Sequence, residues 1–124
     1  MSNTAPKTLR KSVSEERWGH VDMRGPMSSR ADVTIVGASV TIDEHTIGDD
    51  GTATASSDLT FTNAGANTSR ITSVDGRTDI PVGKAVEFFV SGGVAGKTYR
   101  ITITAETNGL ETVVGRVHLK VEAD

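Results

Sequence analysis

Three histidines and two acidic turns carry the side chains in this sequence that are best suited to chemistry. His20, His45 and His118 are far apart along the chain, and none has another His or Cys at the spacing of a metal site. The run 43–45 (Asp-Glu-His) is typical of a solvated turn at a strand end. The run 49–51 (Asp-Asp-Gly), with acids nearby, could gather carboxylates around Ca²⁺, but it lacks a ligand at every second residue. We therefore expect no metal ion and no cofactor.

A glycine-rich segment offers one other chemical possibility, a phosphate-binding loop. Gly96 and Lys97 match the end of such a motif, but Ser91 occupies the place of its first glycine. The segment also leads into a strand, whereas phosphate binding uses the N-terminus of a helix. The sequence has no Cys and no Ser in a G-x-S-x-G context. We expect that the protein is not an enzyme.

The composition indicates one β-rich domain. Of the 124 residues, 35% are hydrophobic and only 4% aromatic, so Val, Ile and Leu must build the core. Thr, Ser and the 13 Gly suit strands and turns better than helices. No stretch approaches the roughly 18 apolar residues of a membrane span, and no apolar segment near the N-terminus resembles a secretory signal. We expect neither membrane insertion nor export by that route.

The first thirty residues differ from the rest in charge and pattern. Residues 1–30 hold six basic and three acidic side chains, whereas residues 31–124 hold seven and thirteen. Trp18 is the only aromatic residue of the basic segment, which argues against nucleic-acid binding. Neither a strand nor a helix period is sustained before residue 31. We therefore predict an extended N-terminal arm over 1–30 and a sandwich over 31–124.

The arm contains large apolar side chains that a solvated tail would waste, so we expect at least part of it to dock. Two alternatives remain. Trp18 packs on its own sandwich as a first strand, or the arm reaches a neighbouring subunit, in which case deleting residues 1–30 should prevent assembly and leave the domain folded. The expected contact residues are Arg17, Trp18, Val21, Met23 and Met27.

From residue 31 onward, alternation and turn signals at roughly 8–12-residue spacing predict about seven strands and a β-sandwich. A switch of phase beside Gly37 suggests a bulge. Turns are expected at 49–51 and 75–76, a loop at 63–67, and strands at 52–62, 70–74 and 84–90.

The last hairpin is the best-specified element. Its inward residues are expected to be Tyr99, Ile101, Ile103 and Ala105, and on the return strand Val113, Val117, Leu119 and Val121. A two-residue turn at 108–109 would set apolar side chains opposite charged ones. A three-residue loop at 107–109 instead pairs Ile103 with Val113 and Tyr99 with Val117, and it places Gly109 where a left-handed residue is needed.

The segment from Val86 to Val121, about a third of the chain, resembles the Ig-like domain of tailed-phage structural proteins of the fiber–tail adaptor group. The resemblance lies in the motif SGGVAGKTY at 91–99, the short turn at 107–109 and the final strand. Gly96 and Tyr99 also resemble a tyrosine corner, in which the hydroxyl bonds to backbone a few residues upstream.

This resemblance implies an immunoglobulin- or fibronectin-like sandwich in which Gly96, Tyr99 and Gly109 have structural roles. It also implies a non-enzymatic virion protein, located in the phage particle. The first reading is a collar, adaptor or fiber-anchoring component of the head–tail region, and the alternative is a capsid decoration protein. The implied partners are capsid, connector or tail subunits and further copies of the chain. A carbohydrate- or receptor-binding module is disfavoured, because it needs exposed aromatic residues and these are scarce.

Overall fold

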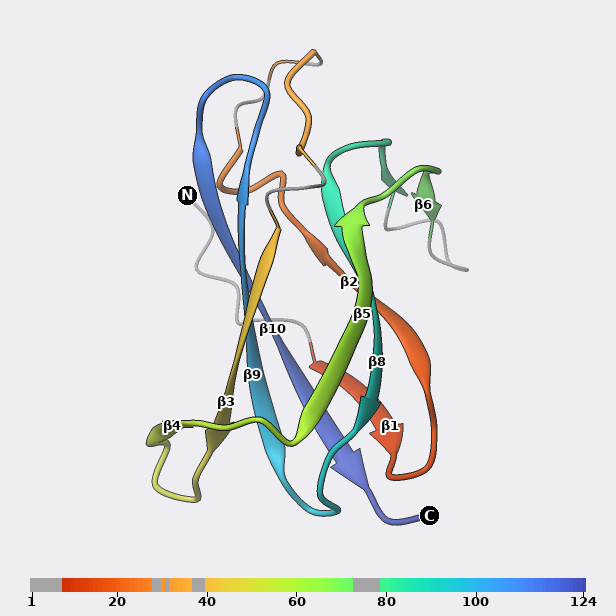
Figure 1. The fold of residues 1–124 in the computed structure, drawn as a ribbon, viewed down its shortest axis with the longest axis vertical. Coiled ribbons are helices and arrows are strands. Elements are labelled where there is room, and N and C mark those ends of the chain that lie inside the picture. Colours follow the sequence, from red (N-terminus) through yellow and green to blue (C-terminus); the bar gives the residue numbers. More distant parts are fainter. Residues whose placement is uncertain (1–7, 28–29, 31, 37–39, 73–78) are drawn as a thin grey trace.

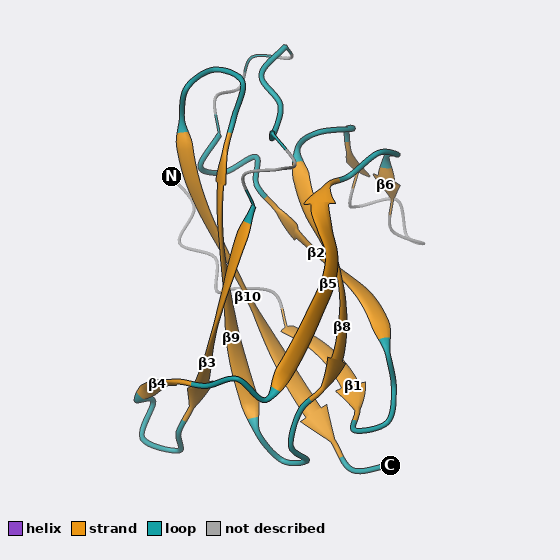
Figure 2. Cartoon of the chain, in the orientation of Figure 1, coloured by secondary structure: helices purple, strands orange, loops and turns teal. Residues whose placement is uncertain are grey.

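Every regular element that the described residues form is a β-strand (Figure 2). The computed structural model describes residues 8–27, 30, 32–36, 40–72 and 79–124. The strands in this part of the chain are β1 (Thr8–Ser12), β2 (Arg17–Asp22), β3 (Thr41–Ile47), β4 (Ala53–Ala55), β5 (Leu59–Ala66), β6 (Ile71–Thr72), β7 (Asp79–Ile80), β8 (Ala85–Gly92), β9 (Thr98–Glu106) and β10 (Thr112–Glu122).

The strands form two main sheets and a short ribbon (Figure 1). The five-stranded sheet has the order β1-β10-β9-β3-β4, the three-stranded sheet has the order β2-β8-β5, and β6 pairs with β7. The inward residues of both sheets belong to a single hydrophobic cluster. The predicted all-β sandwich is thus confirmed. Its ten described strands exceed the predicted seven partly because β4, β6 and β7 are only two or three residues long.

The hairpin of β9 and β10 buries the side chains that alternation predicts. In β9, every second residue from Tyr99 to Ala105 is completely buried. In β10, the inward residues Val113, Val117, Leu119 and Val121 are at most 3% exposed. This hairpin therefore supplies the regular half of the core.

The loop of this hairpin differs from the prediction by one residue. Ile103 lies opposite Gly115, not opposite Val113. The loop begins one residue later than expected, and its left-handed residue is Leu110, at φ 68°, instead of Gly109. The resulting register shift of two residues preserves the side-chain parity, so both faces keep their predicted residues.

Hydrogen bonds to a distant segment explain this shift. The backbone N–H of Asn108 donates to the Thr34 carbonyl (2.9 Å), and the Thr34 N–H donates to Asn108 Oδ1 (3.0 Å). The buried Thr107 hydroxyl accepts from the backbone N–H groups of Gly109 and Glu111. These bonds hold the first half of the loop in place, so the left-handed position moves one residue along the chain.

The N-terminal segment departs most from its prediction. β1 pairs in parallel with β10, and β2 pairs antiparallel with β8 (Figure 1). Residues 8–22 therefore contribute one strand to each sheet. The division into an arm over 1–30 and a sandwich over 31–124 does not hold for the described residues. Deleting residues 1–30 would remove two paired strands, so we now expect that truncation to unfold the domain.

The inward residues of this segment explain why its sequence shows no sustained strand alternation. Leu9 and Val21 enter the core, but Lys11 and Gly19 occupy the alternate inward positions. The Lys11 ammonium donates to three backbone carbonyls, those of Ser12, Val13 and Gly92. Burial lowers the pKa of Lys11, although nearby carboxylates act in the opposite direction. A lysine and a glycine thus replace the apolar residues that would have revealed both strands.

The crossing between the two sheets depends on a buried carboxylate. The predicted strand 52–62 is divided between β4 and β5, because residues 56–58 cross from one sheet to the other. Glu44 is 8% exposed and accepts hydrogen bonds from the Ser56 hydroxyl (2.5 Å) and from the backbone N–H groups of Asp58 and Leu59 (3.0 and 2.9 Å). Glu44 therefore fixes the path of the crossing.

The remaining sequence expectations have mixed outcomes. The strand at 84–90 is confirmed as β8, and the turn at 49–51 is present. The expected loop at 63–67 is wrong for most of its length, because β5 continues to Ala66 through a bulge in which Asn63 has φ 55°. The bulge beside Gly37 and the turn at 75–76 lie outside the described residues.

Candidate interaction surface

Trp18 projects from the outer face of the three-stranded sheet and remains 53% exposed. Its neighbours along β2, Gly19 and Val21, face the core. Trp18 lies opposite Phe89 of β8, and the two rings pack edge to face with centroids 5.4 Å apart. Such pairs are worth about 0.5–1.5 kcal/mol beyond the area they bury. The pair forms a partly exposed aromatic platform, which we call the aromatic face.

Polar side chains surround the aromatic face. In the register of β2 and β8, His20 lies opposite Glu87, two residues along from the aromatic pair. On the other side, Thr62 of β5 lies opposite Phe89. An exposed Trp with a polar rim is the arrangement of a binding hot spot, where one large side chain fills a partner's pocket.

Only one of the five predicted contact residues has an exposed apolar side chain. Val21, Met23 and Met27 are at most 6% exposed and belong to the core. Arg17 is partly buried, and its Nη1 donates to the Arg10 carbonyl (2.6 Å). Four of the five therefore hold the domain together, and Trp18 alone is placed to meet a partner.

Phe89 is the residue of this surface that sequence reasoning missed. Val86, Phe88 and Val90 occupy alternate positions of the predicted strand 84–90, and all three are completely buried. The same alternation places Phe89 on the outside, so the signal was present. What the sequence did not show is that β2 pairs with β8, which sets Trp18 beside Phe89.

Tyr99 makes the contact expected of a tyrosine corner. Its hydroxyl accepts a hydrogen bond from the backbone N–H of Val94 (2.9 Å) and donates to Asp58 Oδ2 (2.8 Å). Burial, together with the neighbouring carboxylates of Asp58 and Glu44, raises the pKa of Tyr99 to about 12, although the Val94 N–H acts against this. Tyr99 therefore ties the β8–β9 loop to the crossing segment.

The two structural glycines differ in what they do. Gly96 has φ 88°, a conformation that L side chains rarely adopt, and its N–H donates to the Val121 carbonyl. Gly109 is not among the residues with positive φ. A side chain at Gly109 would instead lie 3.2 Å from Val33, so this glycine serves close packing.

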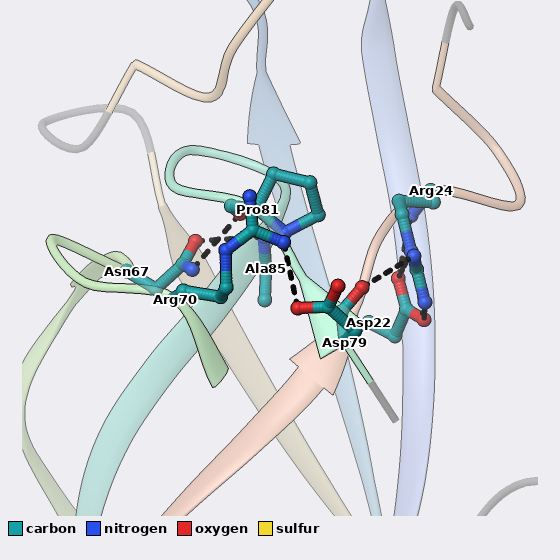
Figure 3. A network of polar contacts seen from close by, with 7 residues as sticks. All are labelled: Asp22, Arg24, Asn67, Arg70, Asp79, Pro81 and Ala85. Carbon is teal, nitrogen blue, oxygen red and sulfur yellow. Dashed lines mark hydrogen bonds and ion pairs between the residues drawn. The ribbon is translucent and has the colours of Figure 1, made fainter. Parts of the chain in front are cut away.

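A network of polar contacts beside β2 is structural (Figure 3). Arg24 donates to the Asp22 carboxylate and to the Asp79 carbonyl, and Arg70 forms an ion pair with Asp79 (2.7 Å). Burial would raise the pKa of Asp22, but the hydrogen bonds from Arg24 outweigh it and leave the pKa below its usual value. Asn67, 1% exposed, donates to Pro81 and accepts from Ala85. These contacts hold the ribbon of β6 and β7 beside β2.

The run 43–45, predicted as a solvated turn, instead lies within β3, where Glu44 is buried, so this prediction is wrong. Within the described residues, no group of three or more His, Cys, Asp or Glu side chains is placed to hold a metal ion. A shallow hollow beside Glu44 is lined partly by Ile42, His45 and Phe61. Because both oxygens of Glu44 already accept hydrogen bonds from the chain, this carboxylate is part of the scaffold.

No family model matches this chain, and no curated protein matches its sequence. No helix among the described residues is long and apolar enough to cross a membrane.

Proposed function

We propose that this chain is a non-enzymatic structural protein of a tailed-phage particle that works by docking. In this proposal it is a collar, adaptor or fiber-anchoring component of the head–tail region, present in several copies. The observation that carries the docking mechanism is the exposed Trp18 packed on Phe89, on the outer face of a sandwich whose other large aromatic side chains turn inward.

The strand order supports the immunoglobulin-like part of the proposal. If β2, β3, β5, β8, β9 and β10 are lettered B to G in chain order, one sheet contains C, F and G and the other contains B, D and E. The tyrosine also fits this scheme. Tyr99 lies near the start of the F strand and bonds to the loop that precedes it.

The position on the particle is tested by quantitative mass spectrometry of purified virions of the phage that encodes the chain. We expect an abundance of a few per cent of the major shell protein, which is typical of a ring at the neck or tail. A ratio near parity would instead make the chain a decoration protein of the shell. Absence from the particle would overturn the virion proposal.

The docking mechanism is tested by Trp18→Ala in a particle-incorporation assay. Loss of a hot-spot tryptophan costs about 2 kcal/mol or more, so incorporation should fall by at least about tenfold. Val94→Ala is the matched control, because Val94 is 45% exposed in a loop away from the aromatic face. Equal incorporation of the two variants would contradict docking through Trp18.

The aromatic face also favours a second candidate, a carbohydrate-binding module. The sequence argued against it because exposed aromatic residues were scarce, but Trp18 and Phe89 lie together on one sheet face. Sugars stack on such platforms through their apolar faces. A glycan array with the unmodified protein and with Trp18→Ala separates the two candidates, since only glycan binding predicts a specific hit that the variant loses.

A further inference from the structure

Basic side chains form a row on the opposite side of the sandwich, across the outer face of the five-stranded sheet. His45 of β3 lies opposite Arg100 of β9, and Arg100 lies opposite His118 of β10. Directly opposed residues in antiparallel sheets have Cβ atoms about 4.5–5.5 Å apart. The three nitrogen-bearing side chains are therefore adjacent neighbours.

Two further basic side chains extend the row along β10. Arg116 and Lys120 lie two residues before and after His118, so all three project from the same face. Alternate residues of a strand are about 6.6–6.8 Å apart. We call the surface formed by His45, Arg100, Arg116, His118 and Lys120 the basic face.

The arginines and the lysine of this face have no carboxylate partner among the described residues. Elsewhere in the described residues, ion pairs with carboxylates engage Arg10, Arg24, Arg30, Arg70 and Lys97. Lys11, Arg17 and Lys84 donate to backbone carbonyls, and Lys120 of the basic face likewise donates to the Gly96 carbonyl (3.4 Å). Arg100, Arg116 and Lys120 form none of the ion pairs found in the described part of the chain. Three cationic side chains without a carboxylate partner therefore lie together on one sheet face.

The centre of the basic face also has unused hydrogen-bonding capacity. His45 Nδ1 and Arg100 Nε are buried atoms that find no hydrogen-bond partner among the described residues. Most buried polar atoms in folded proteins have a partner, so such exceptions call for an explanation. Two of the three such atoms in the described residues lie side by side in this row. A row of basic side chains is complementary to an anionic surface.

We propose that the basic face binds an acidic protein surface, through carboxylates presented at the spacing of alternate strand residues. Aspartate and glutamate at every second position of an extended segment repeat at the same interval of about 6.6–6.8 Å as the cations of β10. Arginine also pairs with carboxylates in a bidentate geometry that strengthens such contacts.

The surroundings of the basic face favour a protein over a nucleic acid. The outward residues of β9 are Thr98, Arg100, Thr102, Thr104 and Glu106, with no aromatic ring on which a base could stack. Asp43 lies opposite Thr102, close to Arg100, and would repel a continuous run of phosphates.

The probe for this proposal is a synthetic peptide of alternating Glu and Thr, with a peptide of the same composition whose Glu residues form one block. Affinity for the full chain is measured by calorimetry at low and moderate salt, beside a short DNA duplex. We expect the alternating peptide to bind several-fold more tightly than the block peptide and the duplex. We also expect its affinity to fall as salt screens the charges.

Matched charge variants locate the binding. The double variant Arg116→Gln with Lys120→Gln should weaken binding of the alternating peptide by about tenfold, if each charge contributes about 0.5–1 kcal/mol. The double variant Arg24→Gln with Arg70→Gln changes the net charge equally, away from the basic face, and should change affinity by less than about twofold.

Each alternative result would overturn the proposal. If the two double variants lose the same affinity for the alternating peptide, the loss comes from net charge and not from a site on the basic face. If no peptide binds, or if the two peptides bind equally, the face does not recognise carboxylates by the spacing of alternate strand residues. Tighter binding of the duplex would make this a nucleic-acid surface. The result is independent of particle incorporation, so the proposed function and this inference can fail separately.

Discussion

The two sheets share one core but present different chemistry to solvent. The three-stranded sheet shows an aromatic pair, Trp18 with Phe89, whereas the five-stranded sheet shows a row of cations centred on Arg100. In both, the inward residues between these outward ones are almost completely buried. Alternation therefore separates the residues that stabilise the fold from those that we propose as contact residues. One small domain can carry two independent contact surfaces and bridge two different partners.

The sheets also differ in regularity. The pairing of β9 with β10 and with β3 runs without a register break. The pairing of β5 with β8 is interrupted by a bulge between Thr62 and Gly65. The five-stranded sheet is the more regular support, and the three-stranded sheet depends more on individual packing contacts.

The separation of core residues from outward residues is tested most sharply with two adjacent phenylalanines of the three-stranded sheet. Phe88 is completely buried and packs edge to face on Phe61, whereas Phe89 faces outward. We expect Phe88→Ala to lower the free energy of unfolding by about 3–5 kcal/mol. Phe89→Ala should cost less than half as much. Urea unfolding of both variants measures the difference, and equal losses would show that the outer face is part of the stabilising core.

In the five-stranded sheet, the corresponding test uses the buried hydroxyl of Tyr99. The unfolded pKa is about 10 and the folded pKa about 12, so the neutral form is favoured by folding. This stabilisation is complete below pH 10 and is lost as the pH rises from about 10 to about 12. Because the chain has a single Tyr, ultraviolet titration follows this group alone.

We expect the absorbance midpoint of the native protein to lie near pH 12 and that of the protein in urea near pH 10. Tyr99→Phe should cost about 1–2 kcal/mol, since it leaves Asp58 and the Val94 N–H without their partner. A native midpoint at the unfolded value would contradict the buried hydrogen-bonded hydroxyl.

A contact between the two sheets is tested at Gly115 of β10. A methyl group there would lie 2.5 Å from Met23 Sδ and 2.9 Å from Val21 Cγ1, closer than the atoms can approach. We expect Gly115→Ala to lower the free energy of unfolding by about 1–3 kcal/mol. Gly65→Ala is the control, because nothing lies within 4 Å of its added methyl group. A neutral Gly115→Ala would mean that Met23 moves away freely.

The smallest effect is expected in the loop that joins β9 and β10. Leu110 is 98% exposed and has φ 68°, so it carries backbone strain with no compensating burial. Leu110→Asn should raise the free energy of unfolding by about 0.5–1 kcal/mol, because asparagine tolerates this conformation better. Thermal unfolding checks the sign, and a loss of stability would show that the leucine packs on the loop.

Local alternation was sufficient to predict the hairpin but not the N-terminal strands. The odd-numbered residues from Tyr99 to Ala105 form an unbroken apolar series, so their burial follows from the sequence alone. In β1 and β2, Lys11 and Gly19 interrupt the series. Their inward placement depends in part on groups distant in sequence, the Gly92 carbonyl for Lys11 and the Phe88 ring for Gly19.

The candidate surfaces could likewise be predicted from the sequence only in part. The sequence predicted Trp18 as a contact residue, but the position of Phe89 beside it depends on the pairing of β2 with β8. The basic face depends on two registers at once, since His45 and His118 meet Arg100 from different strands. The loop register also followed from a contact 74 residues away, between Thr34 and Asn108. Such pairings are set by tertiary structure, and no local pattern reveals them.

The parallel pairing of β1 with β10 determines how the domain responds to mechanical load. The chain enters β1 at Thr8 and leaves β10 at Glu122, at opposite ends of a block of five paired positions. A pull on these two ends slides the strands past each other, so the hydrogen bonds of the block share the force and must break together. A hairpin pulled from one end would instead open one bond at a time. The rate of forced unfolding is set by this step, and the domain is suited to transmit tension along its chain.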